Sequence, residues 1–293
     1  MRALVIGAPG LVGGALTRNL TEAGAQVLGT FHSRPAPGLV PLELTEHEAV
    51  RRLVSEWRPS VVFVCAALTA VDYCEDHEDE AHAINVRGPQ NAAAAAAEVG
   101  ASVVYYSTEY VFDGTGGPYG EDDPISPLGV YARSKADGEQ AVRDTLDEHL
   151  IIRTTVVFGW DPGSKNFAMQ VWQRLSAGEG MRVPADQIGN PTLADFLAES
   201  SVKLVERGQR GTINVVGYDR VPRTEFGWRL ARQLSLDSKL IEPITTAELH
   251  QRAPRPLDAG LRTEKLAAVL GSPAISLDDA IAHFVSAKKR DLG

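Results

Sequence analysis

Cysteine is nearly absent from this chain, which has only Cys65 and Cys74 among its 293 residues. A disulfide framework is therefore excluded, and two isolated thiols suit a reducing cytoplasm. Positive charge is also in short supply, because the formal net charge is -9. That balance argues against nucleic acid or an anionic membrane as a general partner. A phosphorylated ligand would need local help from arginines and helix N-termini.

Long apolar runs are missing as well. The apolar start at residues 3–6 is too short for a signal peptide and is broken at once by Gly7, Pro9 and Gly10, so we expect a strand there. No run is long enough to cross a bilayer. We therefore expect a cytoplasmic protein without a membrane partner, large enough for one main domain and a smaller lobe.

Familiar metal and nucleophile motifs are also lacking. Cys74, His77 and His82 lie among acidic residues, but their spacing matches no tetrahedral pattern, and a solvated turn into a helix explains them. The chain has no His-Glu-x-x-His pair and no nucleophile elbow. We predict no metal site.

Tyr131 and Lys135 stand four positions apart in the stretch Tyr131-Ala-Arg-Ser-Lys135. On a helix they would project from one face, roughly 6 Å apart along the axis. A free phenol titrates near ~10, and a cation beside it would pull its pKa towards ~7, where proton transfer is efficient. The pair predicts an acid–base centre; the alternative is an exposed helix with an incidental Tyr and Lys.

The N-terminal glycines predict a dinucleotide site. An aliphatic strand over residues 2–6 leads into Gly7, Gly10 and Gly13 and then into a helical pattern over residues 11–23. In such a loop the first glycine makes the tight turn, the second lets backbone approach a pyrophosphate, and the third lets the helix pack closely on the strand. The helix N-terminus then offers N–H groups to phosphate.

The end of the second expected strand, residues 26–30, bears on the choice of cofactor. NAD sites usually place an acid there for the ribose hydroxyls, whereas a nearby Arg accommodates a 2′-phosphate. This chain has Ser33 and Arg34 and no acid between residues 30 and 34, which favours NADPH and leaves NADH as the alternative. If Arg34 is only a solvated loop charge, that preference is lost.

Strand and helix patterns alternate along the first half of the chain. A capping-box pattern at residues 45–48 predicts the start of a helix that ends near Trp57. Further strands are expected at 60–66, 101–107 and 150–157, and helices at 79–99 and around Tyr131. The alternation predicts an α/β fold with a Rossmann-type doubly wound parallel sheet.

We expect this dinucleotide-binding domain to span residues 1–158. Residues 159–293 are irregular and punctuated by Gly and Pro, as in a smaller C-terminal lobe around a substrate, with segments that return to the first domain. The helices predicted in this part start near Asn166, Leu193, Thr224 and Ser276.

Thr108 and Glu109 follow the strand predicted at 101–107. Ligands of doubly wound sheets sit beyond the carboxyl ends of the strands, so these side chains are well placed for a substrate. Hydroxyl groups after a strand can also be simple turn caps.

Several blocks of the sequence, taken together and in order, resemble extended short-chain dehydrogenase/reductases and, among them, the dTDP-4-dehydrorhamnose reductase family. The blocks are Gly7-x-x-Gly10-x-x-Gly13, Ala66–Asp72, Ser107–Gly114, Tyr131-x-x-x-Lys135, Asp186–Thr192, Arg255-Pro256 and Leu261–Leu266. The similarity spans nearly the whole chain. It implies NADPH-dependent reduction of the 4-keto group of a nucleotide-linked 6-deoxy sugar, as in dTDP-rhamnose biosynthesis.

The resemblance also implies a role for each matching residue. Tyr131 would protonate the substrate oxygen, and Lys135 would lower the pKa of that phenol and hold the nicotinamide ribose. Thr108 would hydrogen-bond the 4-keto oxygen, and Glu109 would lie beside the sugar. The other cofactor contacts would come from Gly10, Leu11 and Val12 at the pyrophosphate, Glu43 and Leu44 near the adenine, and Ala66, Ala67, Leu68, Thr69 and Tyr106 along the cofactor.

In the second half, Asn166 and Gln187 are predicted substrate contacts. Asn190 and Thr192 either touch the substrate or close the lobe onto the first domain. The candidates for the substrate diphosphate are Arg182, Arg223 and Arg255, because a guanidinium fork matches phosphate geometry. Arg255 ranks first because it lies in a family-like motif.

Departures from the family pattern fall on the substrate side. Glu109 replaces the usual Asp, Val156 stands where the family often has Trp, and the segment at Ala259-Gly260 lacks the usual Ser. The cofactor and the chemistry are therefore better supported than the identity of the sugar.

Two rival functions fit the same scaffold. A sugar-nucleotide epimerase or dehydratase would retain NAD tightly, and in dehydratases paired acids follow the Thr, whereas here Tyr110 follows Glu109. A non-catalytic NADP-binding regulatory subunit similar to the methionine adenosyltransferase β subunit has a loop that resembles Ser-Ser-Asp-Tyr, whereas this chain keeps Thr108. Family analogy places homodimer surfaces on the alanine-rich helix and the Tyr131 helix.

Overall fold

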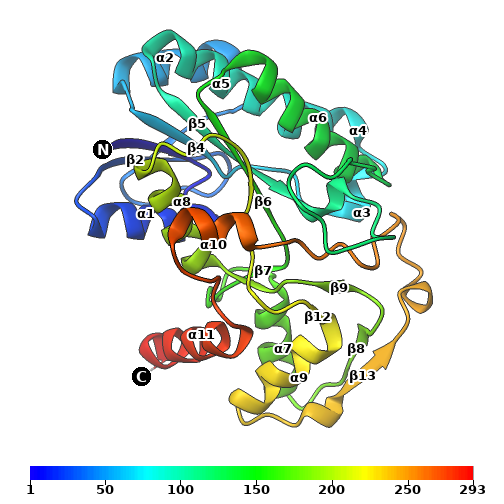
Figure 1. Ribbon diagram of the computed structural model, residues 1–293. Helices are drawn as coiled ribbons and strands as arrows, with labels where there is room; N and C mark the ends of the chain where they lie inside the picture. The colour runs from blue at the N-terminus through cyan, green and yellow to red at the C-terminus, as the bar shows by residue number, and fades with distance from the viewer. Residues whose placement is uncertain (293) are drawn as a thin grey trace.

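Seven parallel strands form the central sheet of the computed structural model, which describes residues 1–292 (Figure 1). The strand order is β11-β6-β5-β4-β1-β2-β3. Their bounds are β1 Arg2–Ile6, β2 Gln26–Phe31, β3 Leu39–Pro41, β4 Val61–Val64, β5 Ser102–Thr108, β6 His149–Thr154 and β11 Gly211–Asn214. The order reverses between β1 and β4, so the ligand crevice is expected beyond the carboxyl ends of these strands.

Helices cover both faces of the sheet (Figure 1). One face packs against α1 (Leu11–Glu22) and α8 (Ala194–Glu206), with α10 (Glu264–Leu270) beside α8. The other face packs against α2 (His47–Trp57), α5 (Gly88–Val99) and α6 (Val130–Thr145). Strands β1, β4 and β5 between these layers are buried almost throughout, which explains their continuous apolar sequences.

Short helical segments connect β4 to this second layer. They are α3 Val71–Cys74, α4 Glu78–His82 and a π-helical turn at Ala83–Arg87 that leads directly into α5. A single 3-10 turn, Glu109–Val111, follows β5 at the crevice. The helix predicted at 79–99 is therefore continuous but not uniform.

The lobe lies beyond the carboxyl edge of the sheet and has a core of its own (Figure 1). Phe158, Phe226 and Phe284 are fully buried at its centre. Its helices are α7 Phe167–Ser176, α9 Arg223–Gln233 and α11 Leu277–Leu292, with 3-10 turns at Ser238–Leu240 and Ala247–Leu249. Its strand pairs are β7 Val157–Phe158 with β10 Thr192–Leu193, β8 Met181–Pro184 with β13 Ile241–Ile244, and β9 Ile188–Gly189 with β12 Val221–Pro222.

The predicted Rossmann-type doubly wound sheet is confirmed. The division of the chain at residue 158 stays a prediction. Two segments beyond that residue pack with the first half, because β11 pairs with β6 and α8 packs against α1. The serine expected to begin the last helix does so, since the Ser276 hydroxyl accepts a hydrogen bond from the N–H of Asp279 at 3.2 Å.

Three details differ from the sequence analysis. The capping box at residues 45–48 is wrong, because the Thr45 hydroxyl donates to the Glu43 carboxylate at 2.7 Å and α2 has no side-chain cap. Strand β3 was not predicted, since it contains only three residues. The strand predicted at 150–157 ends at Thr154, because Val156 adopts a φ of 42°, which no extended strand allows.

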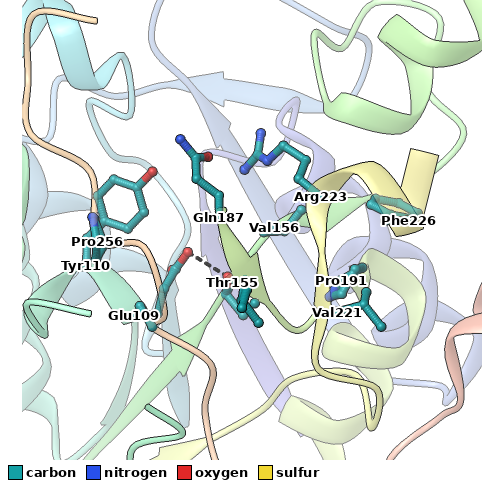
Figure 2. Close-up of a pocket in the computed structure, with 13 residues that line it drawn as sticks. Glu109, Tyr110, Thr155, Val156, Gln187, Pro191, Val221, Arg223, Phe226 and Pro256 are labelled. Atoms are coloured by element: carbon teal, nitrogen blue, oxygen red, sulfur yellow. Dashed lines mark hydrogen bonds between the residues drawn. The ribbon is translucent and has the colours of Figure 1, made fainter. Parts of the chain in front are cut away.

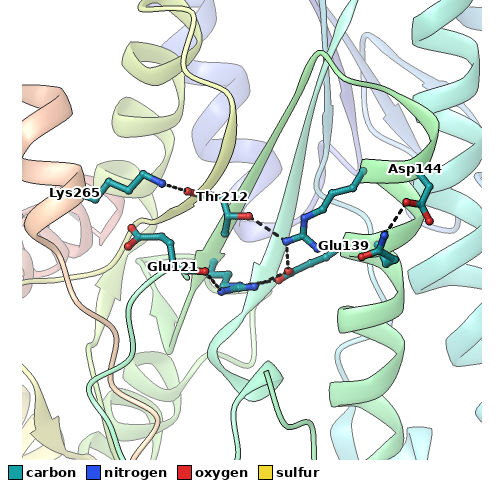
Figure 3. A network of polar contacts seen from close by, with 8 residues as sticks. Glu121, Glu139, Asp144, Thr212 and Lys265 are labelled. Carbon is teal, nitrogen blue, oxygen red and sulfur yellow. Dashed lines mark hydrogen bonds and ion pairs between the residues drawn. The ribbon is translucent and has the colours of Figure 1, made fainter. Parts of the chain in front are cut away.

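A buried ion pair fastens α6 to β6 (Figure 3). Both oxygens of the Glu139 carboxylate accept from Arg153, at 2.9 Å from Nε and 2.8 Å from Nη2. Arg143 adds a bond of 2.7 Å to the same carboxylate. Because Glu139 lies one turn beyond Lys135, which lies one turn beyond Tyr131, this pair fixes the helix face that carries the predicted acid–base centre.

We expect Glu139→Gln to destabilise the fold by about 3 kcal/mol at neutral pH, because it leaves the guanidinium of Arg153 buried without a charged partner. Burial raises the pKa of Glu139, but the hydrogen bonds and charge of Arg153 outweigh it and hold that pKa below its ordinary value. The contribution is therefore complete above the unfolded-state pKa of ~4.3 and is lost as the pH falls through the lower folded-state pKa.

Urea unfolding at pH 7 and at acidic pH measures this effect. Glu199→Gln is the matched control, since its pair with Lys203 is about half exposed and should contribute less than ~1 kcal/mol. Equal unfolding midpoints for Glu139→Gln and the unmodified chain at pH 7 would contradict the expectation.

Candidate active site

The glycine loop between β1 and α1 allows a ligand to come close to the protein backbone. Gly7 has a φ of 89°, and a Cβ there would stand 2.8 Å from the Ala66 nitrogen. A Cβ at Gly13 would overlap the carbonyl oxygen of Gly7, so α1 packs on β1 as closely as backbone allows. Gly10 caps α1 without a side chain, which leaves the first N–H groups of the helix open to an anion. The loop fits a pyrophosphate.

Two adjoining clefts follow the carboxyl ends of the strands. The glycine-loop cleft lies between the loop and the ends of β2, β3 and β4. The central cleft lies between α1, β5 and α6, and the two share Gly10, Arg34, Cys65 and Ala67. All the predicted cofactor residues line one or both: Gly7, Gly10, Leu11, Val12, Gly13, Ser33, Arg34, Glu43, Leu44, Ala66, Ala67, Leu68, Thr69, Tyr106, Tyr131 and Lys135.

An acid does line the same cleft as Arg34, although none follows β2 directly in the sequence. Glu43, which follows β3, lines the same glycine-loop cleft. Its carboxylate accepts from the N–H and the hydroxyl of Thr45, at 3.0 and 2.7 Å, and pairs with His32 at 2.9 Å. Sequence reasoning missed His32, whose only signal was its position two residues before Arg34.

The three predicted catalytic residues line one cleft. Tyr131 and Lys135 come from the first turns of α6, and Thr108 is the last residue of β5. All three side chains are buried. The Lys135 ammonium donates to the Tyr106 carbonyl oxygen at 2.7 Å and lies 4.0 Å from the ring centroid of Tyr105. Burial lowers the pKa of Lys135 to about 7, against the opposing charge of Glu139.

The expected lowering of the Tyr131 pKa by Lys135 is wrong for this structure. Burial is the largest influence and raises the pKa of the Tyr131 phenol well above its ordinary value, and the carboxylate of Glu109 raises it further. A hydrogen bond with Thr108 opposes both. The Lys135 ammonium is instead directed at the Tyr106 carbonyl and the ring of Tyr105. A phenol with a raised pKa keeps its proton at neutral pH, which is the form that can act as an acid.

Glu109 bridges the ends of two strands. The Thr108 hydroxyl donates to Oε2 of Glu109 at 2.7 Å. The Thr155 hydroxyl donates to Oε1 at 2.6 Å, as Figure 2 shows. The Glu109 side chain is buried, and burial raises its pKa although both hydroxyls lower it. Thr155 lies beyond β6 and was missed from the sequence, where nothing distinguishes it from its neighbours.

A second pocket, here called the lobe pocket, opens from the central cleft between the 3-10 turn after β5 and the start of α9. Glu109, Tyr110, Thr155, Val156 and Arg223 line both spaces. Figure 2 shows the side chains of Gln187 and Arg223 extending to the same side of this pocket.

Gln187, a predicted substrate contact, also lines the lobe pocket. Its amide donates to the Thr246 hydroxyl at 3.2 Å. Arg223 places its guanidinium 5.3 Å from the ring centroid of Phe167. Its charge reaches Glu109, whose pKa it lowers.

The other predicted substrate residues have structural partners. Asn166 caps α7, since its side-chain oxygen accepts from the N–H of Met169 at 3.2 Å. Asn190 is buried and bonds to the backbone of Gly217 and Leu261, at 3.0 and 2.9 Å, so it joins three segments of the second half of the chain.

Two of the candidate arginines are paired with acids. Arg182 lies 3.6 Å from Glu248 on the outer part of the lobe. The side chain of Arg255 is only 7% exposed and pairs with Asp72 at 3.0 Å. That contact ties the loop after β13 to α3, next to Tyr110. Burial raises the pKa of Tyr110, and the charge of Arg255 opposes that rise.

Within residues 1–292, no group of three or more His, Cys, Asp or Glu side chains is arranged to hold a metal ion. No helix in that range combines the length and the apolar character needed to cross a membrane.

A family model described as the RmlD substrate binding domain matches residues 1–290. The chain belongs to that family. The RmlD family is the one that the glycine loop, the Thr108 loop and the Tyr131–Lys135 pair indicate together, so the predicted family is confirmed.

Relatives of this RmlD family member span almost its full length. The chain is 34% identical to a probable low-salt glycan biosynthesis reductase of Haloferax volcanii, over 98% of each chain. It is also 34% identical to a dTDP-4-dehydrorhamnose reductase of Mycobacterium tuberculosis, over 98% of this chain and 93% of the relative. A methionine adenosyltransferase 2 subunit beta of Xenopus laevis is 31% identical, over 90% of this chain and 81% of that protein.

A solved structure agrees with the fold of the chain. The dTDP-4-dehydrorhamnose reductase of Bacillus anthracis, crystallised in complex with NADP, superposes with a TM-score of 0.89 at 29% identity. The match covers 97% of this chain and 98% of that one.

We expect Gly13→Ala to abolish tight binding of a dinucleotide, with NADPH as the probe, because the added methyl group overlaps the Gly7 carbonyl and must push α1 away from the loop. Isothermal titration calorimetry measures the loss, which should exceed about tenfold, as a displacement that costs even ~1.4 kcal/mol would produce. Gly14→Ala is the matched control, since its methyl group would meet nothing closer than 3.6 Å. Equal affinities of the two variants would contradict the role given to Gly13.

Proposed function

We propose that this chain is a reductase that uses NADPH to reduce the 4-keto group of a nucleotide-linked 6-deoxy sugar, with NADH as the alternative donor. The observation that carries the proposal is the meeting of Tyr131, Lys135 and Thr108 in one buried cleft that continues past the glycine loop. The names of the RmlD-family reductases and the NADP complex of the Bacillus anthracis protein support it.

Bound NADPH would supply the hydride that reduces the ketone carbon. The N–H groups at the start of α1 would hold its pyrophosphate, and Lys135, which lines the central cleft, would hold the nicotinamide ribose. The Tyr131 phenol retains its proton at neutral pH and gives it to the oxygen on which negative charge develops. The Thr108 hydroxyl stands next to this position and orients the carbonyl.

For the substrate diphosphate we propose Arg223. Arg223 lines both the lobe pocket and the central cleft, whereas the side chain of Arg255 is ion-paired with Asp72. Arg255 keeps a supporting role in this proposal, because the loop that it anchors brings Pro256 and Ala259 to the lobe pocket. Gln187 and Glu109 would contact the sugar between these charges and the catalytic cluster.

The non-catalytic rival has a specific observation in its favour, namely the 31% identity to the Xenopus laevis β subunit. Against it, this chain retains Thr108, Tyr131 and Lys135 together in the cleft. Mixing the protein with NADPH and a dTDP-4-keto-6-deoxy sugar, and following the absorbance of the reduced cofactor, separates the two. No oxidation with any such sugar would sink the reductase assignment.

A homodimer formed through α5 and α6 stays part of the proposal, to be checked by sedimentation.

Tyr131→Phe is expected to lower kcat by about a thousandfold, because removal of a positioned acid typically costs 10²–10⁴-fold. Binding of NADPH should stay within about threefold of the unmodified protein, since the ring remains and only the hydroxyl is lost. Steady-state kinetics and calorimetry measure both quantities. Tyr218→Phe, at a side chain that is 62% exposed, is the control. A Tyr131→Phe enzyme with normal turnover would refute the role of the phenol.

Arg223→Met should raise KM for the sugar nucleotide by about tenfold with little change in kcat, because a charge-assisted hydrogen bond to phosphate contributes roughly 1.5–3 kcal/mol. Arg182→Met serves as the matched control on the outer part of the lobe. A lower kcat at unchanged KM would show that Arg223 acts on the reacting group instead of the diphosphate.

A further inference from the structure

The Thr108 hydroxyl has one proton and two lone pairs to distribute. One lone pair accepts from the N–H of Tyr110 at 3.2 Å. The contact with Oε2 of Glu109, at 2.7 Å, uses either the proton or the second lone pair, depending on which of the two oxygens carries the hydrogen. What Thr108 presents to the central cleft is therefore set by the protonation state of Glu109.

An ionised Glu109 can only accept, so it takes the Thr108 proton. The hydroxyl then shows a lone pair to the cleft, which suits the O–H of Tyr131 but repels a carbonyl oxygen. A protonated Glu109 donates from Oε2, and both lone pairs of Thr108 are then occupied. The Thr108 proton is free in that state to donate into the cleft.

The surroundings of Glu109 favour its protonation. The side chain is buried, and burial raises the pKa of its carboxyl above the ordinary range. The opposing groups are the hydroxyls of Thr108 and Thr155 and the charge of Arg223 on α9. The phenols of Tyr110 and of Tyr131 on α6 also face it, and both keep their protons at neutral pH. Lys135 on α6 lines the same cleft.

We propose, building on the reductase function above, that Glu109 is a positioning residue which in its protonated form turns the Thr108 hydroxyl towards the substrate oxygen and in its ionised form turns it away. No atom of Glu109 needs to touch the substrate for this effect. The two arrangements differ by one proton. This proton is bound to Oε2 of Glu109 in the active arrangement and is released to solvent in the inactive one.

The length of the glutamate side chain matters to this arrangement. Glu109 follows β5, whereas Thr155 follows β6, and one carboxylate reaches both hydroxyls at 2.7 and 2.6 Å. The left-handed backbone of Val156, with a φ of 42°, ends the strand directly after Thr155. A β-branched residue adopts that conformation only under constraint from its surroundings, so the turn that presents Thr155 is imposed by the packing.

The experiment compares the dependence of kcat on pH in the full-length protein and in three variants. Glu109→Gln mimics the protonated acid, because its amide donates to Thr108 while its oxygen accepts from Thr155. Relative to its own maximum, kcat of this variant should no longer show the decline that the unmodified enzyme shows as Glu109 ionises. Thr155→Val removes one donor to the carboxylate and should move that decline to higher pH by about one unit. Thr155→Ser keeps the donor and should follow the unmodified enzyme.

Infrared difference spectroscopy gives a readout that needs no turnover. The carbonyl stretch of a protonated carboxylic acid should be present in the unmodified protein below the pH at which kcat declines, absent in Glu109→Gln at that same pH, and retained to higher pH in Thr155→Val. Absence of this band, or identical pH profiles for the unmodified enzyme and Glu109→Gln, would overturn the role of Glu109 alone. A normal band in a protein that reduces no keto sugar would instead overturn the proposed function.

Discussion

The buried pairing of Glu139 with Arg153 is the contact on which the site depends. It joins α6, which carries Tyr131 and Lys135, to β6, which ends at Thr154 just before Thr155 and Val156. A bidentate pair fixes both the rotation of the helix and its position along the strand, because two parallel hydrogen bonds allow only one alignment. The same ion pair therefore positions the face of α6 that carries Tyr131 and Lys135 and the end of β6 that leads to Thr155.

Burial, more than any single charge, sets the electrostatics of the cleft. It lowers the pKa of Lys135 to about 7 and raises the pKa values of Tyr131 and Glu109. Each shift favours the uncharged form, as expected where water is excluded. For Tyr131 and Glu109 the uncharged form is the protonated one, which suits a reaction that ends in protonation of an oxygen. Behind the reacting groups, Glu139 is paired with two arginines.

Local motifs made most of the site predictable from the sequence. The glycine loop works through backbone conformation alone, so Gly7, Gly10 and Gly13 identify the cofactor end without knowledge of the fold. The Tyr131–Lys135 pair needs only a helix to be brought together. The parallel sheet likewise follows from the alternation of apolar runs and helical patterns.

What stayed hidden depends on contacts between segments far apart in the chain. Thr155 meets Glu109 across 46 positions, and nothing local distinguishes it from Thr154. Arg255 looked free in the sequence because its partner, Asp72, lies in a distant part of the chain. The expected effect of Lys135 on Tyr131 failed for a related reason, since spacing on a helix does not show how deeply a side chain is buried. The glutamate at residue 139 could have been found, because it continues the four-residue spacing of Tyr131 and Lys135.

Val156 belongs to the walls of both the central cleft and the lobe pocket, and its unusual backbone angle sets the direction of the neighbouring threonine. The shape of the substrate space and the hydrogen bond that Thr155 makes to Glu109 therefore both depend on the backbone at Val156. A substitution at Val156 that suits a bulkier or smaller sugar would also alter the pH dependence of the enzyme. Relatives that differ at this residue should therefore differ both in the size of the sugar they accept and in the pH at which they work.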